Sequence, residues 1–413
     1  MSGNEAYERQ TRWLRNVCAG SFLLSLGLAF ALVRREAAAE VWGLGALALL
    51  TVGAWTLLPR LRARGWPCRW FLSLAVLNLL AVVPELALRL RGFRYESGRQ
   101  FGYPQPSEFT RFVPHPQLLW TYAPGQPGVN AWGFREREVR PRAARERAAR
   151  VVFLGDSCTE QGYPAILELL HNARHPEAPI ECLSLALSGY SSWQGRRVAE
   201  LYGARAEADV AVVWFGWNDH WLAYGAPDAE KRAPEARQAP WRHVLAGSRL
   251  LQLAQRLADR ALGRQSRPLG RPRVSAEEYR ANLTAIYGVF ERLGVPVVFV
   301  TAPSSHAAVR VPDFLVSDGL LPDKATGLRW HAEYNAVVRE VQRACPRSVL
   351  CDLETAYRRL PPDALRRVFM GDGIHFMPAG LALVASDVLR AVEEVKSLGP
   401  AGGSAAGGRG AGE

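Results

Sequence analysis

The sequence predicts an α/β fold in which a parallel sheet of about five strands lies between two layers of helices, preceded by N-terminal transmembrane helices. Beyond residue 150, short apolar runs alternate with segments of helical period, which implies parallel crossovers. The first of these runs, 151–154, has no polar alternation, as expected for a strand buried on both faces. Before residue 90, three long apolar runs have lengths that suit membrane-spanning helices.

The N-terminal region, residues 1–95, is predicted to be a membrane anchor. No small-residue cleavage site clearly ends its first apolar run, and short arginine-bearing connectors separate the runs. Three transmembrane helices are therefore the simplest interpretation. Pro84 and Glu85 interrupt the third run, which allows a tilted or re-entrant helix. The three runs cover residues 17–33, 41–58 and 70–88.

The placement of arginines favours a cytoplasmic N-terminus. Arginines precede the first run and lie between the second and third runs, which leaves Arg34 and Arg35 on the other side of the membrane. This orientation places the C-terminal domain outside the cytoplasm. The arginines after the third run favour the opposite orientation, although long translocated domains weaken the rule.

Residues 96–149 lead from the anchor to the α/β domain. The part from 101 to 135 is rich in proline, glycine and aromatic residues, and we expect irregular structure packed on that domain. The arginine-rich stretch that follows is expected to be a solvated connector or helix rather than a binding site.

The α/β domain itself is predicted at residues 150–397, followed by a disordered Gly/Ala-rich tail at 398–413. An insertion or lid at 220–274 interrupts it. Within this insertion, 241–264 has helical amphipathicity, and we favour a core helix slightly over a lid on the membrane surface. After the strand at 151–154, the expected elements are helices at 163–174, 192–205, 276–293, 330–344 and 379–395, and strands at 180–185, 210–215, 297–301 and 348–353.

A Gly-Asp-Ser turn directly follows the first strand of this domain. Ser157 lies just past the carboxyl end of a central strand, where open α/β sheets hold their reactive groups. Gly155 is expected to let the backbone bend sharply there. Taken alone the tripeptide is weak evidence, because the same residues also form ordinary turns and helix caps.

Three further motifs follow in order and make the signal strong. They contain Gly189, Asn218 in a Gly-Trp-Asn-Asp sequence, and an Asp-x-x-His pair formed by Asp372 and His375. With Ser157, the chain resembles the SGNH/GDSL hydrolase superfamily over residues 151–395, in the manner of its membrane-anchored bacterial members. The resemblance implies an SGNH-type, flavodoxin-like three-layer sandwich.

The resemblance also implies catalytic roles that the chemistry of these residues supports. Ser157 would be the nucleophile, His375 the base that takes its proton, and Asp372 the acceptor that fixes the imidazole. The backbone N–H groups of Ser157 and Gly189, with the side-chain amide of Asn218, would form the oxyanion hole. Two other histidines, His220 and His306, are expected to be structural or lid residues.

Composition limits the partners of the protein. The formal net charge of +12 permits an anionic partner, but no nucleic-acid motif accompanies the arginines, so no nucleic acid is expected. The apolar runs imply a membrane as partner, and the family resemblance implies an acyl-ester substrate. Without a Cys-x-x-Cys pair or a histidine cluster at ligand spacing, no metal or other cofactor is expected. Cys345 and Cys351 could close a small loop in an oxidising compartment, but free buried thiols are the favoured interpretation.

The sequence thus predicts a membrane-anchored serine esterase that forms an acyl-serine and acts on acyl esters of cell-envelope glycans or lipids. The expected location is a bacterial inner membrane, with the catalytic domain outside the cytoplasm. The substrate rests on family analogy and anchoring alone. The alternatives are an O-acyltransferase or deacetylase for an envelope polysaccharide, and a catalytically degenerate domain that binds glycan.

Overall fold

The computed structural model describes the chain at residues 16, 80, 83–85, 87–93, 95, 112–145, 148–231, 248–262 and 268–397. The chain divides into two compact units. The smaller unit contains residues 1–98, 105–110 and 237–265, and the larger contains residues 99–104, 111–236 and 266–413. The predicted tail, 398–413, and the predicted transmembrane runs at 17–33 and 41–58 lie outside the described residues.

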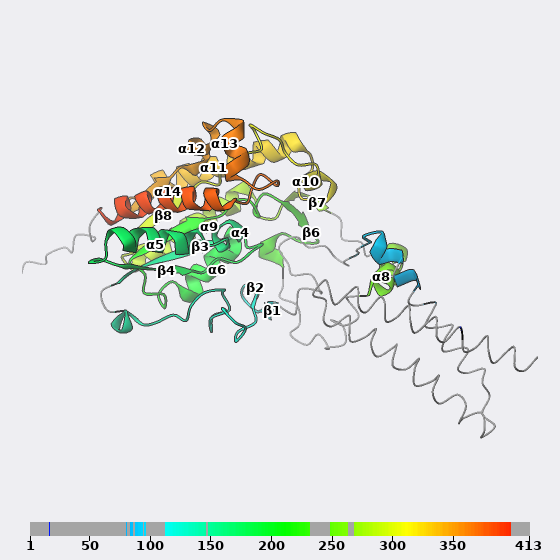
Figure 1. The fold of residues 1–413 in the computed structure, drawn as a ribbon, viewed down its shortest axis with the longest axis horizontal. Helices are drawn as coiled ribbons and strands as arrows, with labels where there is room; N and C mark the ends of the chain where they lie inside the picture. The colour runs from blue at the N-terminus through cyan, green and yellow to red at the C-terminus, as the bar shows by residue number, and fades with distance from the viewer. Residues whose placement is uncertain are drawn as a thin grey trace, which may run out of the picture. The chain divides into compact units, whose positions relative to one another are not determined.

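A five-stranded parallel sheet forms the centre of the larger unit (Figure 1). It consists of β3 (Ala149–Gly155), β4 (Ile180–Ser184), β5 (Val210–Trp214), β8 (Val297–Val300) and β9 (Ser348–Cys351). The strand order is β4-β3-β5-β8-β9, and all neighbours are parallel, which confirms the predicted sheet. The winding reverses between β3 and β5, and open α/β sheets hold ligands outside the carboxyl ends of their strands at such a point.

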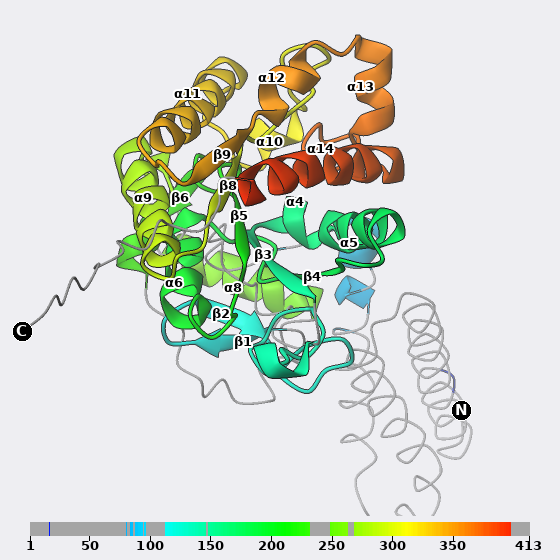
Figure 2. The same ribbon diagram turned by 90° about the vertical axis from the view of Figure 1, so that its left-hand side faces the viewer.

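Helices cover both faces of this sheet (Figure 2). On one face, α5 (Tyr163–Arg174) and α14 (Pro378–Lys396) pack along each other. On the other face lie α6 (Ser192–Tyr202), α9 (Ala276–Arg292) and α11 (Lys324–Arg343). The three layers of the predicted α/β sandwich are therefore present.

Alternate residues of β3 face opposite helical layers, which explains the unbroken apolar sequence of this strand. Val151 and Phe153 pack in the cluster that contains α5 and α14, whereas Val152 and Leu154 pack with α6, α9 and α11. All four side chains are buried, and burial of one such side chain contributes about 1.5–3 kcal/mol. Packing on both sides therefore fixes the position of the turn that follows the strand.

The segment ahead of the sheet contains a β-hairpin, which differs from the expectation of irregular structure. Strand β1 (Phe112–His115) pairs antiparallel with β2 (Leu119–Tyr122). Trp120 and Phe134 are buried in the same cluster as α6, and the hydroxyl of Tyr190 donates a hydrogen bond to the carbonyl of Trp120 over 2.6 Å. The aromatic residues of this segment thus complete the core of the larger unit.

Most predicted elements agree closely with the structure, and the differences have local causes. Helix α11 begins at Lys324 rather than at residue 330, because Asp323 caps it and accepts a hydrogen bond from the N–H of Thr326 at 2.8 Å. Strand β9 ends two residues before the predicted end because Asp352 caps the next helix. The sequence pattern does not predict α4 (Ser157–Glu160), α10 (Phe314–Ser317), α12 (Leu353–Arg358), α13 (Pro362–Val368) and the 3-10 turns Arg142–Ala144 and Asp228–Glu230.

The insertion at 220–274 contributes to both units. In the larger unit, β6 (Leu222–Tyr224) pairs antiparallel with β7 (Pro268–Pro272). In the smaller unit, α8 (Arg249–Ala261) lies within the predicted amphipathic segment. Its interpretation as a core helix is wrong, because none of the apolar side chains described on α8 is buried, and Leu257 is 59% exposed.

Glu85, which interrupts the third apolar run, has a structural role in the smaller unit. Its carboxylate is buried and accepts hydrogen bonds from the N–H groups of Arg249 and Leu250, at 2.9 and 2.8 Å, at the start of α8. It also pairs with Arg89 at 2.8 Å. A carboxylate in this position satisfies unpaired amides and complements the helix dipole. The charge therefore links the end of the apolar run to the insertion.

Among the helices of the described residues, none is both long enough and apolar enough to cross a membrane. The third predicted run, 70–88, is described only at residues 80, 83–85 and 87–88. The predicted three-helix anchor therefore stays a prediction.

Candidate active site

The predicted nucleophile lies at the end of the central strand. Helix α4 begins at Ser157, and the cap residue Asp156 accepts a hydrogen bond from the N–H of Cys158 at 2.9 Å. A Cβ on Gly155 would lie 2.1 Å from Thr159 Oγ1, so glycine allows α4 to pack directly against β3. The φ of Gly155 is not in the left-handed region, so this close approach, rather than a positive φ, is what requires glycine at the turn from β3 into α4.

Ser157, His375 and Asp372 form a continuous line of hydrogen bonds. His375 Nε2 lies 2.8 Å from Ser157 Oγ, and His375 Nδ1 lies 2.6 Å from Asp372 Oδ2. The other carboxylate oxygen of Asp372 accepts hydrogen bonds from the N–H groups of Ile374 and His375, at 2.9 and 3.0 Å. Asp372 thereby fixes the tautomer in which Nε2 can accept the serine proton.

The pair of Asp372 and His375 controls the protonation of the site. Burial by itself would raise the pKa of Asp372, but hydrogen bonds from His375 and from backbone amides lower it to about 2. Burial by itself would lower the pKa of His375, but the hydrogen bond and the charge of Asp372 raise it above the usual 6.5. Asp372 is therefore an anion at neutral pH, and the titration of His375 governs whether the site has a base.

The turn that carries this pair is fixed by a neighbouring loop. Gly373 has a φ of +72°, and a Cβ there would lie 2.6 Å from the ring of His306, so only glycine fits. His306 Nε2 lies 2.7 Å from the carbonyl of Asp372, and the N–H of Ser305 donates to the carbonyl of Gly373 at 3.1 Å. Burial lowers the pKa of His306. These contacts fit the expected structural role of His306 beside Asp372 and His375.

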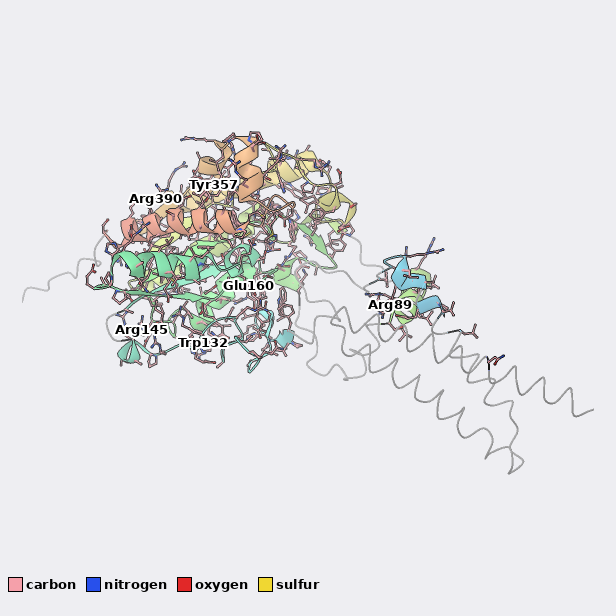
Figure 3. The ribbon with its side chains drawn as sticks, in the orientation of Figure 1. Arg89, Trp132, Arg145, Glu160, Tyr357 and Arg390 are labelled. Carbon is pink, nitrogen blue, oxygen red and sulfur yellow. The ribbon has the colours of Figure 1, made fainter. Side chains whose placement is uncertain are left out.

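Glu160 of α4 and the C-cap residue Gln161 hold the loops on either side of Ser157. Glu160 (Figure 3) accepts hydrogen bonds from the hydroxyl of Tyr122 and from the N–H of Ser188, the latter at 2.7 Å. Gln161 accepts a hydrogen bond from the N–H of Phe376 at 3.0 Å and donates one to its carbonyl at 3.3 Å. The helix that begins at the predicted nucleophile therefore also positions the loops of Gly189 and His375.

The three predicted oxyanion donors lie in loops that contact one another. Asn218 Nδ2 donates to the carbonyl of Tyr190 at 3.0 Å and lies 3.4 Å from Asp156 Oδ2. The contact to Asp156 is longer than a usual hydrogen bond. The Nδ2 hydrogen that faces Asp156 is therefore the one that could donate to an oxyanion. The backbone N–H groups of Ser157 and Gly189 make no hydrogen bond to another residue of the described chain. All three donors thus follow the carboxyl ends of neighbouring strands.

Asp219, next to Asn218, is a buried carboxylate that braces the same loops. It accepts hydrogen bonds from the N–H of Ser192 at 2.8 Å and from the N–H of Gly216 at 3.1 Å. Burial raises the pKa of Asp219 to about 7 and that of Asp156 to about 6. Removing either acceptor would leave buried N–H groups unpaired, which costs about 1–3 kcal/mol each.

A buried ion pair, which the sequence does not reveal, supports the Gly189 loop. Arg273 and Asp228 are fully buried and lie 2.7 Å apart. Arg273 also donates to the carbonyl of Gly189 at 3.0 Å, and Ser191 donates to Asp228 at 2.7 Å. Burial by itself would raise the pKa of Asp228, but Arg273 and Lys231 lower it. This network fixes the backbone around one proposed oxyanion donor.

The predicted structural role of His220 agrees with its surroundings. Its ring is buried beside Trp217, and its Nε2 lies 3.2 Å from His331 Nδ1. Burial lowers the pKa of His220 to about 3, so the ring is neutral at physiological pH. Trp217 stacks on His331 with ring centroids 4.1 Å apart. These residues form a packed layer under the Asn218 loop rather than a second acid–base pair.

Comparison with known proteins shows which proteins this chain is similar to. The GDSL-like lipase/acylhydrolase family model matches residues 153–383. A lipase/acylhydrolase from Enterococcus faecalis is 16% identical, with 62% of this chain and 100% of that chain covered and a TM-score of 0.39. The acetylxylan esterase Axe2 from Geobacillus stearothermophilus is 17% identical, with 60% and 96% covered and a TM-score of 0.37. No curated protein matches the chain.

Proposed function

The chain belongs to the GDSL-like lipase/acylhydrolase family, the SGNH hydrolases that act on ester bonds, and we propose that it is a membrane-associated serine esterase that forms an acyl-serine at Ser157. One observation carries this proposal. His375 Nε2 lies 2.8 Å from Ser157 Oγ, while Asp372 holds His375 Nδ1 at 2.6 Å. A histidine held in this way can take the proton of a serine hydroxyl.

In the first half-reaction, Ser157 Oγ attacks the acyl carbonyl carbon as its proton passes to His375 Nε2. The tetrahedral intermediate then collapses, the bond to the alcohol oxygen breaks, and His375 gives the proton to that oxygen. Asp372 stays ionised throughout and stabilises the imidazolium without taking its proton.

In the second half-reaction, water attacks the acyl-serine and passes a proton to His375. The carboxylic acid leaves when the bond to Ser157 Oγ breaks and the proton returns to that oxygen. In both halves the oxyanion would accept hydrogen bonds from the N–H groups of Ser157 and Gly189 and from the amide of Asn218. Loss of one such donor raises a barrier by about 3–4 kcal/mol.

Acyl esters of cell-envelope glycans or lipids are the proposed substrates, and a bacterial inner membrane with the catalytic domain outside is the proposed location. The apolar runs at 17–33, 41–58 and 70–88 support this proposal. In the smaller unit, Leu90 and Leu257 are 80% and 59% exposed. Apolar side chains exposed in this way suit contact with lipid better than contact with water.

Hydrolysis of a short-chain aryl ester by the purified protein tests the nucleophile. The Ser157→Ala variant should lose this activity and keep the melting temperature of the wild type, because the change removes one oxygen from a partly exposed turn. Retained hydrolysis in the variant would refute the assignment. Detection of the free carboxylic acid, with and without a sugar acceptor, distinguishes a hydrolase from the alternative O-acyltransferase.

Reporter fusions after Glu413 test the proposed location. Alkaline phosphatase should be active at this point, and a protein that fluoresces only in the cytoplasm should stay dark, because three spans from a cytoplasmic N-terminus place the domain outside. The opposite pattern would refute the external location, and with it the proposed envelope glycan substrate.

A further inference from the structure

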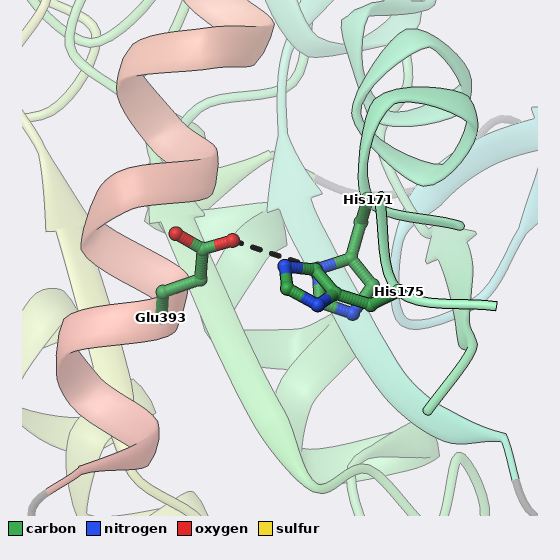
Figure 4. A group of neighbouring side chains, drawn as sticks. All are labelled: His171, His175 and Glu393. Atoms are coloured by element: carbon green, nitrogen blue, oxygen red, sulfur yellow. Dashed lines mark ion pairs between the residues drawn. The ribbon is translucent and has the colours of Figure 1, made fainter. Parts of the chain in front are cut away.

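A second cluster of ligand-type side chains lies at the edge of the sheet opposite to Ser157. Helices α5 and α14 begin near the carboxyl ends of the strands and run to the other edge, where His171, His175 and Glu393 meet. Figure 4 shows the three side chains facing one another from the two helices. One ligand atom from each residue lies within 4.8 Å of the others. We infer that they bind a divalent transition-metal ion, with zinc as the best match.

The sequence contains the signal for this site. His171 and His175 are four residues apart, so they lie on one face of a helix. The expectation that no histidines have ligand spacing is therefore wrong. Imidazole nitrogens combined with one carboxylate oxygen form a ligand set that suits zinc.

The tautomer of His171 leaves a lone pair directed at Glu393. His171 Nε2 lies 3.1 Å from the carbonyl of Ala178, and because a carbonyl only accepts, Nε2 carries the proton. Nδ1 is buried and has no hydrogen-bond partner among the described residues. The side chain of His171 is 8% exposed, and its Nδ1 lies 3.6 Å from Glu393 Oε1. A cation between these two lone-pair atoms, either a metal ion or a proton, would stabilise this arrangement.

The distances suit a tetrahedral ion. Zinc binds nitrogen and oxygen at about 2.0–2.1 Å, so two of its ligand atoms lie about 3.3–3.4 Å apart. The 3.6 Å between His171 Nδ1 and Glu393 Oε1 is close to this value. The side chains of His175 and Glu393 are 46% and 40% exposed, which allows them to close the remaining separation and leaves a position for water.

The surroundings also favour a cation. The hydrogen bond from His171 to the Ala178 carbonyl is the second contact that metal-binding histidines usually make, and it fixes the ring. His175 is the C-cap of α5, and Glu393 lies in the last turn of α14, so two helix C-termini direct their partial negative charge toward the site. Bound zinc would join the far ends of two helices that begin beside Ser157 and His375.

Zinc titration of the full-length, metal-free protein by isothermal calorimetry tests this site. We expect one zinc ion per chain and a rise in melting temperature on saturation. His175→Ala and Glu393→Gln should each weaken zinc binding by about tenfold or more, because each removes a ligand. The matched controls are Glu394→Gln, which removes the neighbouring carboxylate of α14, and His375→Ala, which removes the histidine at the other edge. Both controls should bind zinc like the wild type.

Two results would overturn the inference. The first is no saturable zinc binding by the folded wild-type protein, which would leave His171 and Glu393 as an ion pair formed by protonation. The second is an equal loss of zinc in the controls, which would place the ion elsewhere. The measurement needs no ester substrate, so its outcome is independent of the proposed esterase activity.

Discussion

The two edges of the central sheet each hold a histidine whose tautomer is fixed by one hydrogen bond, and they differ in the group that faces the second ring nitrogen. At the carboxyl edge, Asp372 holds Nδ1 of His375, and Nε2 faces the hydroxyl of Ser157. At the opposite edge, a backbone carbonyl holds Nε2 of His171, and Nδ1 faces the carboxylate of Glu393. The hydroxyl has a proton to transfer, and the carboxylate has none.

The comparison shows that the chemistry of a histidine held in one tautomer depends on the group opposite its second ring nitrogen. Opposite a hydroxyl, it acts as a base. Opposite a carboxylate, it completes a site for a cation. Substitution of Ser157 or His375 should therefore remove turnover and leave stability nearly unchanged, whereas substitutions at the other edge should change metal-dependent stability and leave turnover unchanged.

The largest effect is expected for His375→Ala. Without the base, kcat for an aryl ester should fall by about 10⁴- to 10⁶-fold, because the serine hydroxyl keeps its proton. The double variant with Ser157→Ala should be no worse than either single variant, since both residues serve one step. Steady-state kinetics of all three proteins provide the measurement, and losses that multiply in the double variant would contradict a shared step.

Asp372→Asn should have the next largest effect, lowering kcat by about 10⁴-fold by stabilising the wrong tautomer. In the wild type, kcat/KM should rise with pH through the pKa of His375. Burial lowers this pKa, but the hydrogen bond and the charge of Asp372 together raise it above 6.5. Since the variant lacks that charge, its profile should rise at a lower pH. Identical midpoints in the two pH–rate profiles would contradict this electrostatic role.

Asn218→Ala tests the oxyanion hole. The variant should lose about 10²- to 10³-fold in kcat with little change in KM, because the lost hydrogen bond forms mainly in the transition state. Kinetics with the same aryl ester provide the measurement. A loss confined to KM would show that Asn218 binds the substrate instead.

The smallest effect on turnover is expected at the opposite edge. His175→Ala should keep kcat/KM within about twofold of the wild type, because its C-cap position lies at the far end of α5 from the nucleophile. The rise of its melting temperature with zinc should require at least about tenfold more zinc than in the wild type. A loss of turnover comparable to that of Asn218→Ala would contradict the separation of the two edges.

Much of the fold could be predicted from the sequence, and so could the serine, asparagine and histidine of the candidate site. The strands are buried on both faces, so β3 and β5 appear as unbroken apolar runs in the sequence. Ser157, Asn218 and His375 belong to short motifs whose order is informative. Parallel strands bring their carboxyl ends to one edge, and the structure accordingly places these loops together.

The supporting residues could not be predicted in the same way, because their partners are distant in sequence. Arg273 pairs with Asp228 under the Gly189 loop, and His306 reaches the carbonyl of Asp372 from another loop. Neither pair forms a local pattern. The period of α8 likewise revealed an apolar face but not what covers it, which is why the core-helix interpretation fails.

The central claim is that Ser157 is an activated nucleophile, and labelling with a fluorophosphonate probe tests it most directly, since the probe reacts with activated serines. The wild-type protein and His175→Ala should be labelled at the same rate, with the adduct located on Ser157 by mass spectrometry. Ser157→Ala should not be labelled, and His375→Ala should be labelled far more slowly. A folded wild-type protein without an adduct on Ser157, or with its adduct on another serine, would contradict the account.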